Sequence, residues 1–130
     1  MSEVPEGLRY TKDHEWARLE GTLARVGITD HAQHEITDVV FVELPKAGRA
    51  VKGGEAAAVV ESVKAAFDIY APVAGIVSVV NDDVARNPAV LNQSPYEKGW
   101  LFKLQAAAPA DRDGLMTHLQ YQEFIKTSQH

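Results

Sequence analysis

The sequence predicts a mainly β protein, built as an antiparallel sandwich or barrel with short helices. Short runs rich in β-branched and aromatic residues follow one another closely, and glycine, proline or Asx turn signals separate them. Of the 130 residues, 45% are apolar and 24% are charged, which is a globular composition. No repeat or linker divides the chain, so we expect one domain over residues 1–130, with a core at about 8–105 and a C-terminal helical extension at about 109–127.

The predicted strands lie between residues 23 and 104. They are residues 23–28 (LARVGI), 39–44 (VVFVEL), 55–63, 67–70, 73–80 (VAGIVSVV) and 99–104 (GWLFKL). Pro45, Pro72 and Asn81 end three of these runs, because proline and Asx residues interrupt strands. Strands this short and this close together favour antiparallel pairing.

Short helices are expected between the strands. Residues 30–36 follow Thr29, a residue type that caps helix N-termini. Residues 82–86 form a single-turn candidate that ends at Asn87-Pro88, because the residue before a proline disfavours the helical conformation.

The C-terminus predicts two helical pieces. They cover residues 111–119 and 121–126, with Gln120 as the joint between them. In the second piece one face carries the larger apolar side chains of Tyr121, Phe124 and Ile125.

Composition and charge exclude several classes of protein. Thirteen basic and 18 acidic side chains give a net charge of −5, which argues against a nucleic-acid binder and against a polybasic membrane surface. The longest apolar stretch, residues 73–80, is too short to cross a bilayer, and MSEVPEGLRY has no signal-peptide pattern. We expect a bacterial cytoplasmic protein, or a mitochondrial matrix protein if a transit peptide was removed. The absence of cysteine excludes disulfides, thiolate zinc sites and a cysteine nucleophile.

Lys64 stands between two predicted strands. Small residues surround it: Ser62, Ala65 and Ala66. Because lysine is costly to bury, its side chain should point to solvent, and pairing of the two strands as a hairpin would place it at or near the tip. The apolar residues before it share no parity, so the register stays open, and the turn lacks the Asn-Gly that tight hairpins prefer. The residues alone leave two interpretations: a solvated charge, or the attachment point of a covalent arm.

The histidines raise a metal hypothesis. His31 and His34 lie three residues apart on a predicted helix with Glu35 beside them, whereas His14 lies elsewhere in the chain. Such spacing can serve a shared metal, but no third ligand is evident and the metalloprotease spacing is absent. We therefore predict no metal site and keep a metal-dependent hydrolase as a distant alternative.

Several longer motifs occur in order along the chain. They are YTKDHEW at 10–16, VGITDHAQ at 26–33, VFVELP at 40–45, Gly48, ESVKA at 61–65, Asp68, Ala71-Pro72, Val73-Ala74-Gly75, Asn81, Asn87-Pro88, Leu91-Asn92, Ser94-Pro95-Tyr96 and Gly99-Trp100. On these motifs the chain resembles the lipoyl-carrying H protein family of the glycine cleavage system, from about Leu8 to about Phe124.

The resemblance implies a barrel-sandwich hybrid of antiparallel sheets, like lipoyl and biotinyl domains, with lipoic acid in amide linkage to Lys64. Ordinary bond lengths give such an arm a reach of about 12–14 Å. A lipoate ligase or a lipoyl/octanoyl transferase would recognise the residues around the lysine: Glu61, Ser62, Val63 and Ala65. A chain without cysteine suits this cofactor, since protein thiols exchange with a dithiolane.

The resemblance also implies three partner enzymes. The family's arm accepts an aminomethyl group from glycine decarboxylase, a pyridoxal phosphate enzyme, and presents it to aminomethyltransferase, which uses tetrahydrofolate. Dihydrolipoamide dehydrogenase, which uses FAD and NAD, then reoxidises the arm. The carrier itself is a non-catalytic component. We expect a monomer that docks weakly on each enzyme in turn.

In the family, the loaded arm folds back into a surface cleft that shields it from water. By position, the resemblance places four residues in that cleft and adds two further candidates: Glu15, Ile28, Asp68 and Ala71, then Asp13 and Glu35. Phe67 departs from the family, which usually has a small polar residue there. Its ring could pack along the arm, but we favour the interpretation that it covers a neighbouring strand.

Two other carrier functions use the same lysine. Relay of lipoyl groups to other proteins stays open as an alternative. A biotin carrier is disfavoured, because that family places methionine on both sides of the lysine and here Val63 and Ala65 flank Lys64.

Overall fold

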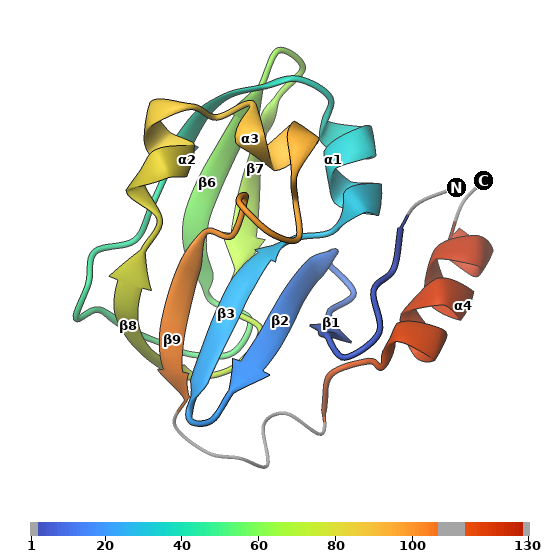
Figure 1. Cartoon of the computed structure of the whole chain (residues 1–130), viewed down its shortest axis with the longest axis horizontal. Coiled ribbons are helices and arrows are strands. Elements are labelled where there is room, and N and C mark those ends of the chain that lie inside the picture. The colour runs from blue at the N-terminus through green and yellow to red at the C-terminus, as the bar shows by residue number, and fades with distance from the viewer. Residues whose placement is uncertain (1–2, 107–113, 129–130) are drawn as a thin grey trace.

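The computed structural model describes residues 3–106 and 114–128, and it confirms the predicted fold class. Within these residues two antiparallel sheets and short helices form a barrel-sandwich (Figure 1). The six-stranded sheet has the order β1-β2-β3-β9-β8-β5. Its strands are β1 (Arg9–Tyr10), β2 (Glu15–Glu20), β3 (Leu23–Ile28), β5 (Ala50–Val51), β8 (Gly75–Val80) and β9 (Phe102–Ala106).

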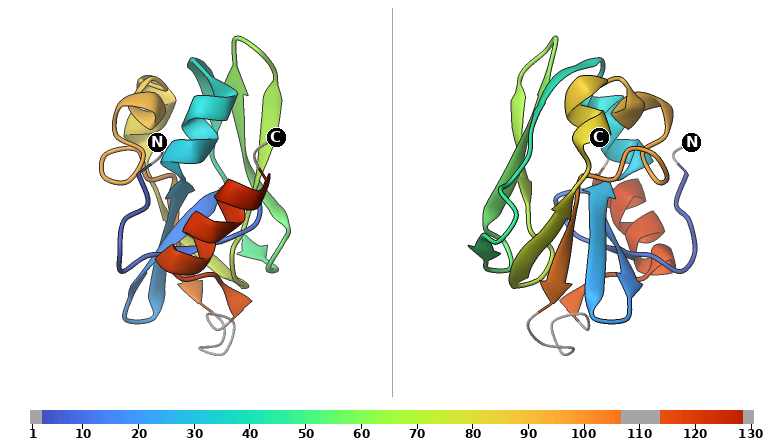
Figure 2. Two further views of the ribbon diagram at one scale, coloured as in Figure 1. Left: turned by 90° about the vertical axis from the view of Figure 1, so that its right-hand side faces the viewer. Right: turned by 60° about the vertical axis from the view of Figure 1, so that its left-hand side comes forward.

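The smaller sheet has three strands in the order β4-β6-β7. They are β4 (Val39–Glu43), β6 (Ala56–Ser62) and β7 (Ala66–Tyr70). β6 and β7 form the predicted hairpin, whose turn is the uppermost part of Figure 1. Figure 2 shows that this hairpin stands beside the first helix and apart from the larger sheet.

The main core lies between the two sheets. Val26 on β3, Val60 on β6 and Leu104 on β9 are fully buried, and Val42 and Ile69 of the smaller sheet belong to the same buried cluster. In β3 and β6 buried positions recur at every second residue over part of the strand, which is the pattern of a strand with one face on a core. The predicted alternation of short apolar runs therefore corresponds to two facing sheets.

Three short helices cover one end of the sheets: α1 (Asp30–Ile36), α2 (Asp82–Arg86) and α3 (Val90–Gln93) (Figure 1). Thr29 caps α1 as predicted, since its Oγ1 accepts from the Ala32 amide N–H at 3.1 Å. Asn81 caps α2. The sequence analysis missed α3, a single turn that follows Asn87-Pro88 and buries Leu91.

Some strand boundaries differ from the prediction. β1, β2 and β5 were not predicted, and β9 begins at Phe102 rather than at residue 99. The segment before β9 is a loop because the Asn81 side-chain amide donates to the carbonyl oxygens of Lys98 and Trp100 at 2.9 and 2.8 Å. These bonds bend the backbone away from a strand conformation until Phe102.

The prediction of two C-terminal helical pieces is wrong. One helix, α4 (His118–Ser128), runs through Gln120, and residues 114–117 are not α-helical; residues 111–113 lie outside the described part. Thr117 and Gln120 explain the start of α4, because each accepts a hydrogen bond through its side chain from the other's backbone N–H, at 2.8 and 3.2 Å. This capping box starts the helix at His118, and Gln120, which we had placed as a joint, lies in the first turn of α4.

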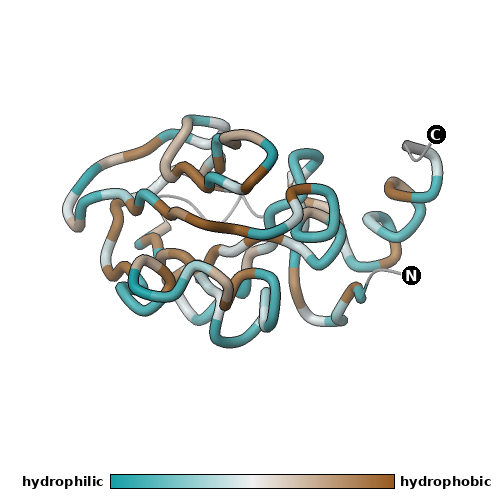
Figure 3. The backbone as a smooth tube through the Cα atoms, turned by 90° about the horizontal axis from the view of Figure 1, so that it is seen from above, coloured by the Kyte–Doolittle hydropathy of each residue, from teal (hydrophilic) through white to brown (hydrophobic). Residues whose placement is uncertain are grey.

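A second apolar cluster attaches α4 to the N-terminal strands. Tyr10 and Tyr121 stack with ring centroids 4.6 Å apart, and Trp16, Tyr96 and Ile125 pack around them. Figure 3 shows α4 as alternating apolar and polar segments beside the N-terminal end, as expected for a helix with one buried face. None of the helices within the described residues has the length and apolar character needed to cross a membrane.

Candidate functional site

Lys64 lies in the turn that joins β6 to β7. The two strands pair with Glu61 opposite Ala66 and Val60 opposite Phe67, so residues 62–65 make the turn. Val63, with 71% of its surface exposed, and Lys64 occupy the two central positions. The structure therefore places the lysine at the tip of the hairpin, in solvent.

Ser62 holds the shape of this turn. Its backbone N–H donates to the Ala65 carbonyl oxygen at 2.9 Å, and its buried Oγ accepts from the amides of Lys64 and Ala65 at 3.0 and 3.2 Å. Among the described residues other than glycine, positive φ occurs only at His14 and Thr37, so the turn needs no left-handed residue. A serine-capped turn with ordinary φ values explains why Asn-Gly is absent here.

The hairpin tip is tied to the C-terminal end of α1. The Val63 amide N–H donates to the Asp38 carbonyl oxygen at 3.0 Å. Lys64 Nζ donates to the Glu35 carbonyl oxygen at 3.1 Å. That oxygen belongs to the last turn of α1, where carbonyl groups lack partners within the helix. The lysine side chain thus extends from the hairpin towards α1.

A cleft of about 110 Å³ opens between α1, β7 and the loop before β2. Its lining includes five of the residues that the sequence analysis proposed: Asp13, Ile28, Glu35, Phe67 and Asp68. The remaining lining residues were not foreseen: His14, Ala32, Ile36 and Ile69. The half-buried Phe67 both lines this cleft and packs against the main core.

Glu15 and Ala71 do not line the cleft. Both are buried, and Glu15 is only 1% exposed. The two carboxylate oxygens of Glu15 accept hydrogen bonds from the Thr11 hydroxyl and, at 3.1 Å, from the Tyr70 amide N–H. Burial raises the pKa of Glu15 to about 7, although both hydrogen bonds oppose the rise. About half of the Glu15 carboxyl groups are therefore protonated near pH 7.

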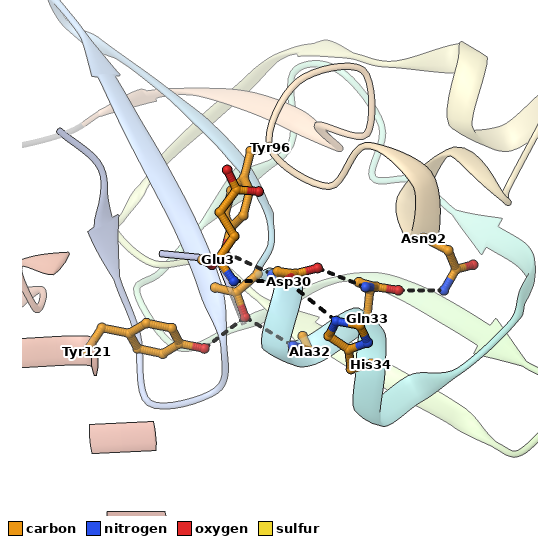
Figure 4. Close-up of polar contacts among 9 residues, drawn as sticks. Glu3, Asp30, Ala32, Gln33, His34, Asn92, Tyr96 and Tyr121 are labelled. Atoms are coloured by element: carbon orange, nitrogen blue, oxygen red, sulfur yellow. Dashed lines mark hydrogen bonds and ion pairs between the residues drawn. The ribbon is translucent and has the colours of Figure 1, made fainter. Parts of the chain in front are cut away.

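A network of polar contacts holds α1 in place (Figure 4). At its N-terminus, Asp30 accepts from the Glu3 amide at 2.9 Å and from the Gln33 side chain at 2.8 Å, and its own amide donates to the Tyr96 hydroxyl at 2.9 Å. Gln33 in turn accepts from the Asn92 side chain of α3 at 3.2 Å. The partners of α1 come from three separate segments, the N-terminal residues, α3 and the loop after it, and they fix the helix that forms one wall of the cleft.

Tyr121 connects α4 to the cleft region. Its hydroxyl lies 2.8 Å from Thr29 Oγ1 and 2.8 Å from His14 Nδ1. The His14 ring is 4.6 Å from the ring of His31, centroid to centroid, and the Nε2 atom of His31 is 3.2 Å from a carboxylate oxygen of Glu35. Burial, followed by the nearby His31, lowers the pKa of His14.

The sequence analysis paired His31 with His34, and the structure corrects this grouping. His34 is exposed, and its Nε2 lies 3.5 Å from a carboxylate oxygen of Asp30, whereas His31 faces His14 and Glu35. The helical spacing of His31 and Glu35 was a usable signal, because residues four apart share a helix face. No local pattern could have shown that His14 joins them.

Known proteins similar to this chain form a consistent group. The sequence model of a family described as Glycine cleavage H-protein matches residues 8–128. The chain is 52% identical over 122 residues to the glycine cleavage system H protein of Endomicrobium trichonymphae, covering 94% of this chain and 98% of that one. It is 55% identical over 112 residues to the protein of the same name from Bradyrhizobium diazoefficiens, covering 86% and 92%. The structure is similar to the crystal structure of a glycine cleavage system H protein from Mycobacterium marinum, with a TM-score of 0.84, 35% identity and coverage of 95% and 98%.

Proposed function

The chain belongs to the glycine cleavage H-protein family, and we propose that Lys64 is the residue to which lipoic acid is attached. Membership of this family makes the chain the lipoyl-carrying shuttle of the glycine cleavage system. The observation that carries the assignment to Lys64 is its position: an exposed lysine at the centre of a hairpin turn, inside the ESVKA motif. Amide formation at Nζ needs a lysine that a second protein can reach.

The residues around Lys64 fit a lipoylating enzyme as partner. Ser62 is buried and fixes the turn, so the turn is presented in one shape. Glu61, Val63 and Ala65 are exposed on either side of the lysine. A lipoate ligase or lipoyl/octanoyl transferase would read these exposed side chains, whereas Ser62 would act through the turn geometry.

The cleft beside α1 fits the role of a shelter for the loaded arm. Lys64 already extends towards the end of α1 that borders the cleft. The lining combines apolar side chains, such as Ile28 and Phe67, with the carboxylates of Glu35 and Asp68. When bound, the lipoyl group supplies a disulfide–dithiol couple; the chain's own residues would exclude water and offer negative charge to an amine.

We further propose that the chain catalyses no bond change itself. In this proposal glycine decarboxylase, aminomethyltransferase and dihydrolipoamide dehydrogenase carry out the reactions, and this chain presents Lys64 to each. The hairpin tip is exposed and narrow, which suits successive small and weak contacts with different enzymes.

Intact mass after enzymatic lipoylation tests the attachment site. The chain is incubated with lipoate ligase, lipoate and ATP, and we expect one lipoyl increment, which peptide mapping assigns to Lys64. The Lys64→Ala variant should gain none. Lys46→Ala removes an exposed lysine from another turn and should be lipoylated as fully as the wild type. An increment on Lys64→Ala, or its absence from the wild type, contradicts the proposal.

A further inference from the structure

The group formed by His14, His31 and Glu35 has no part in the attachment of the arm. His14 and Glu35 line the cleft, and the buried His31 lies beside them on α1. One nitrogen from each histidine and one carboxylate oxygen lie within 4.8 Å of one another. We propose that these three side chains bind a divalent transition-metal ion of the zinc type.

The donor types and spacing favour zinc. Two imidazole nitrogens and one carboxylate oxygen are a ligand set that Zn²⁺ takes in proteins. Ligands about 2 Å from a tetrahedral ion lie about 3.3 Å from one another. The 3.2 Å separation of His31 Nε2 from Glu35 Oε1 already matches such an edge. The ligand atom of His14 lies within 4.8 Å of both, and it would have to move closer to them to complete the set.

The surroundings of His14 support a ligand role. Its Nδ1 lies 2.8 Å from the Tyr121 hydroxyl, which is itself 2.8 Å from Thr29 Oγ1. This hydrogen bond orients the ring and leaves Nε2 for an ion, as partners behind metal-bound histidines do. The backbone of His14 also has a φ of 69°, which is uncommon for a residue other than glycine. The chain therefore holds this ring towards α1 through both its backbone and its tyrosine contact.

The site offers three protein ligands and one open side. His14 and Glu35 both line the cleft, and the Glu35 side chain is 60% exposed, so an ion between them would face the cleft. Three protein ligands with an open fourth position are the arrangement of zinc sites that bind water or an exchangeable ligand. The inference goes beyond the carrier function and does not depend on Lys64.

Titration of the unlipoylated, metal-stripped chain with Zn²⁺ and Co²⁺ tests the proposal. Calorimetry should show one Zn²⁺ per chain, and Co²⁺ should give the intense visible absorption of a tetrahedral site. Glu35→Gln changes an exposed side chain and should weaken binding roughly tenfold or more while the circular dichroism stays unchanged. Tyr121→Phe, which removes only the hydroxyl behind His14, should weaken it about tenfold.

His34→Gln is the matched control. It removes an exposed histidine from the same helix, next to Glu35 in sequence, and should leave the affinity and the Co²⁺ spectrum unchanged. Two results would overturn the proposal: no binding of either ion by the wild type, or equal binding by the wild type and Glu35→Gln. Equal loss of binding in His34→Gln and Glu35→Gln would also overturn it, because the ion would then occupy a surface site.

Discussion

Glu15 links the stability of the fold to pH. It is 1% exposed, and burial raises its pKa from the ordinary value of 4.5 to about 7. The folded chain therefore holds this proton more tightly than the unfolded chain. Protonation of Glu15 therefore favours the folded chain over the unfolded chain. This contribution to the free energy of unfolding is complete below about pH 4.5, falls as the pH rises, and is lost above about pH 7.

We expect Glu15→Gln to remove this pH dependence. Relative to the variant, the wild type should lose roughly 3 kcal/mol of unfolding free energy between pH 4.5 and pH 7.5. Urea unfolding at several pH values, in buffer containing a chelator, measures the difference. Glu43→Gln removes an exposed carboxylate from β4 and serves as the control. A constant difference between wild type and Glu15→Gln across this range would contradict the raised pKa.

At the scale of single elements, local signals predicted some segments and not others. The β6–β7 hairpin and β3 were predictable because short, mainly apolar runs that contain β-branched residues lie between turn signals. β2 (Glu15–Glu20) was not, since charged residues fill half of it and its pairing with β3 supplies the strand geometry. The start of α4 was encoded locally by Thr117 and Gln120, and we missed a capping box that the sequence contains.

The contact of β8 with β9 yields a prediction about Gly75. Gly75 pairs with Ala106, and a Cβ added at Gly75 would overlap the Gln105 carbonyl oxygen, which belongs to the backbone and cannot swing away. We expect Gly75→Ala to destabilise the fold by about 1–3 kcal/mol. Gly53→Ala is the control, because its nearest atoms would lie 3.7 Å away. Thermal unfolding compares the two; similar midpoints would show that β8 and β9 can separate without cost.

At the scale of the whole molecule, the candidate site consists of residues that are close in the sequence and of residues that only tertiary packing brings together. Lys64, Phe67 and Asp68 lie within a few residues of one another, so their grouping was predictable. His14 and Tyr121 could not be placed by local patterns, because only the packing of α4 on the N-terminal strands brings the tyrosine hydroxyl to the histidine. The lining of the cleft by His14 is likewise a consequence of tertiary contacts.

The exposed charged side chains differ between the two ends of the smaller sheet. Val39 pairs with Ser62 and Glu43 with Val59, so β4 leads away from the hairpin tip. Beyond its far end lie three exposed cationic residues, Lys46, Arg49 and Lys52, and one exposed carboxylate, Glu55, which pairs with Arg49 at 3.2 Å. Near the tip, exposed carboxylates gather instead: Glu35, Asp38 and Glu61. Acylation of Lys64 would remove its charge and change the net charge from −5 to −5 − 1 = −6, which makes this end still more acidic.

We therefore expect partner enzymes to dock on the tip through basic surfaces. The KM of the lipoylated chain in coupled glycine cleavage should rise several-fold between about 0.01 and 0.15 M salt, as the screening length falls from about 30 to about 8 Å. Glu61→Gln, next to the turn, should raise the KM at low salt and flatten its salt dependence. Glu123→Gln removes an exposed carboxylate from α4, away from the tip (Figure 1), and should leave both unchanged. A KM that does not respond to salt would exclude electrostatic docking, and equal effects of the two variants would show that net charge, rather than the tip, guides the encounter.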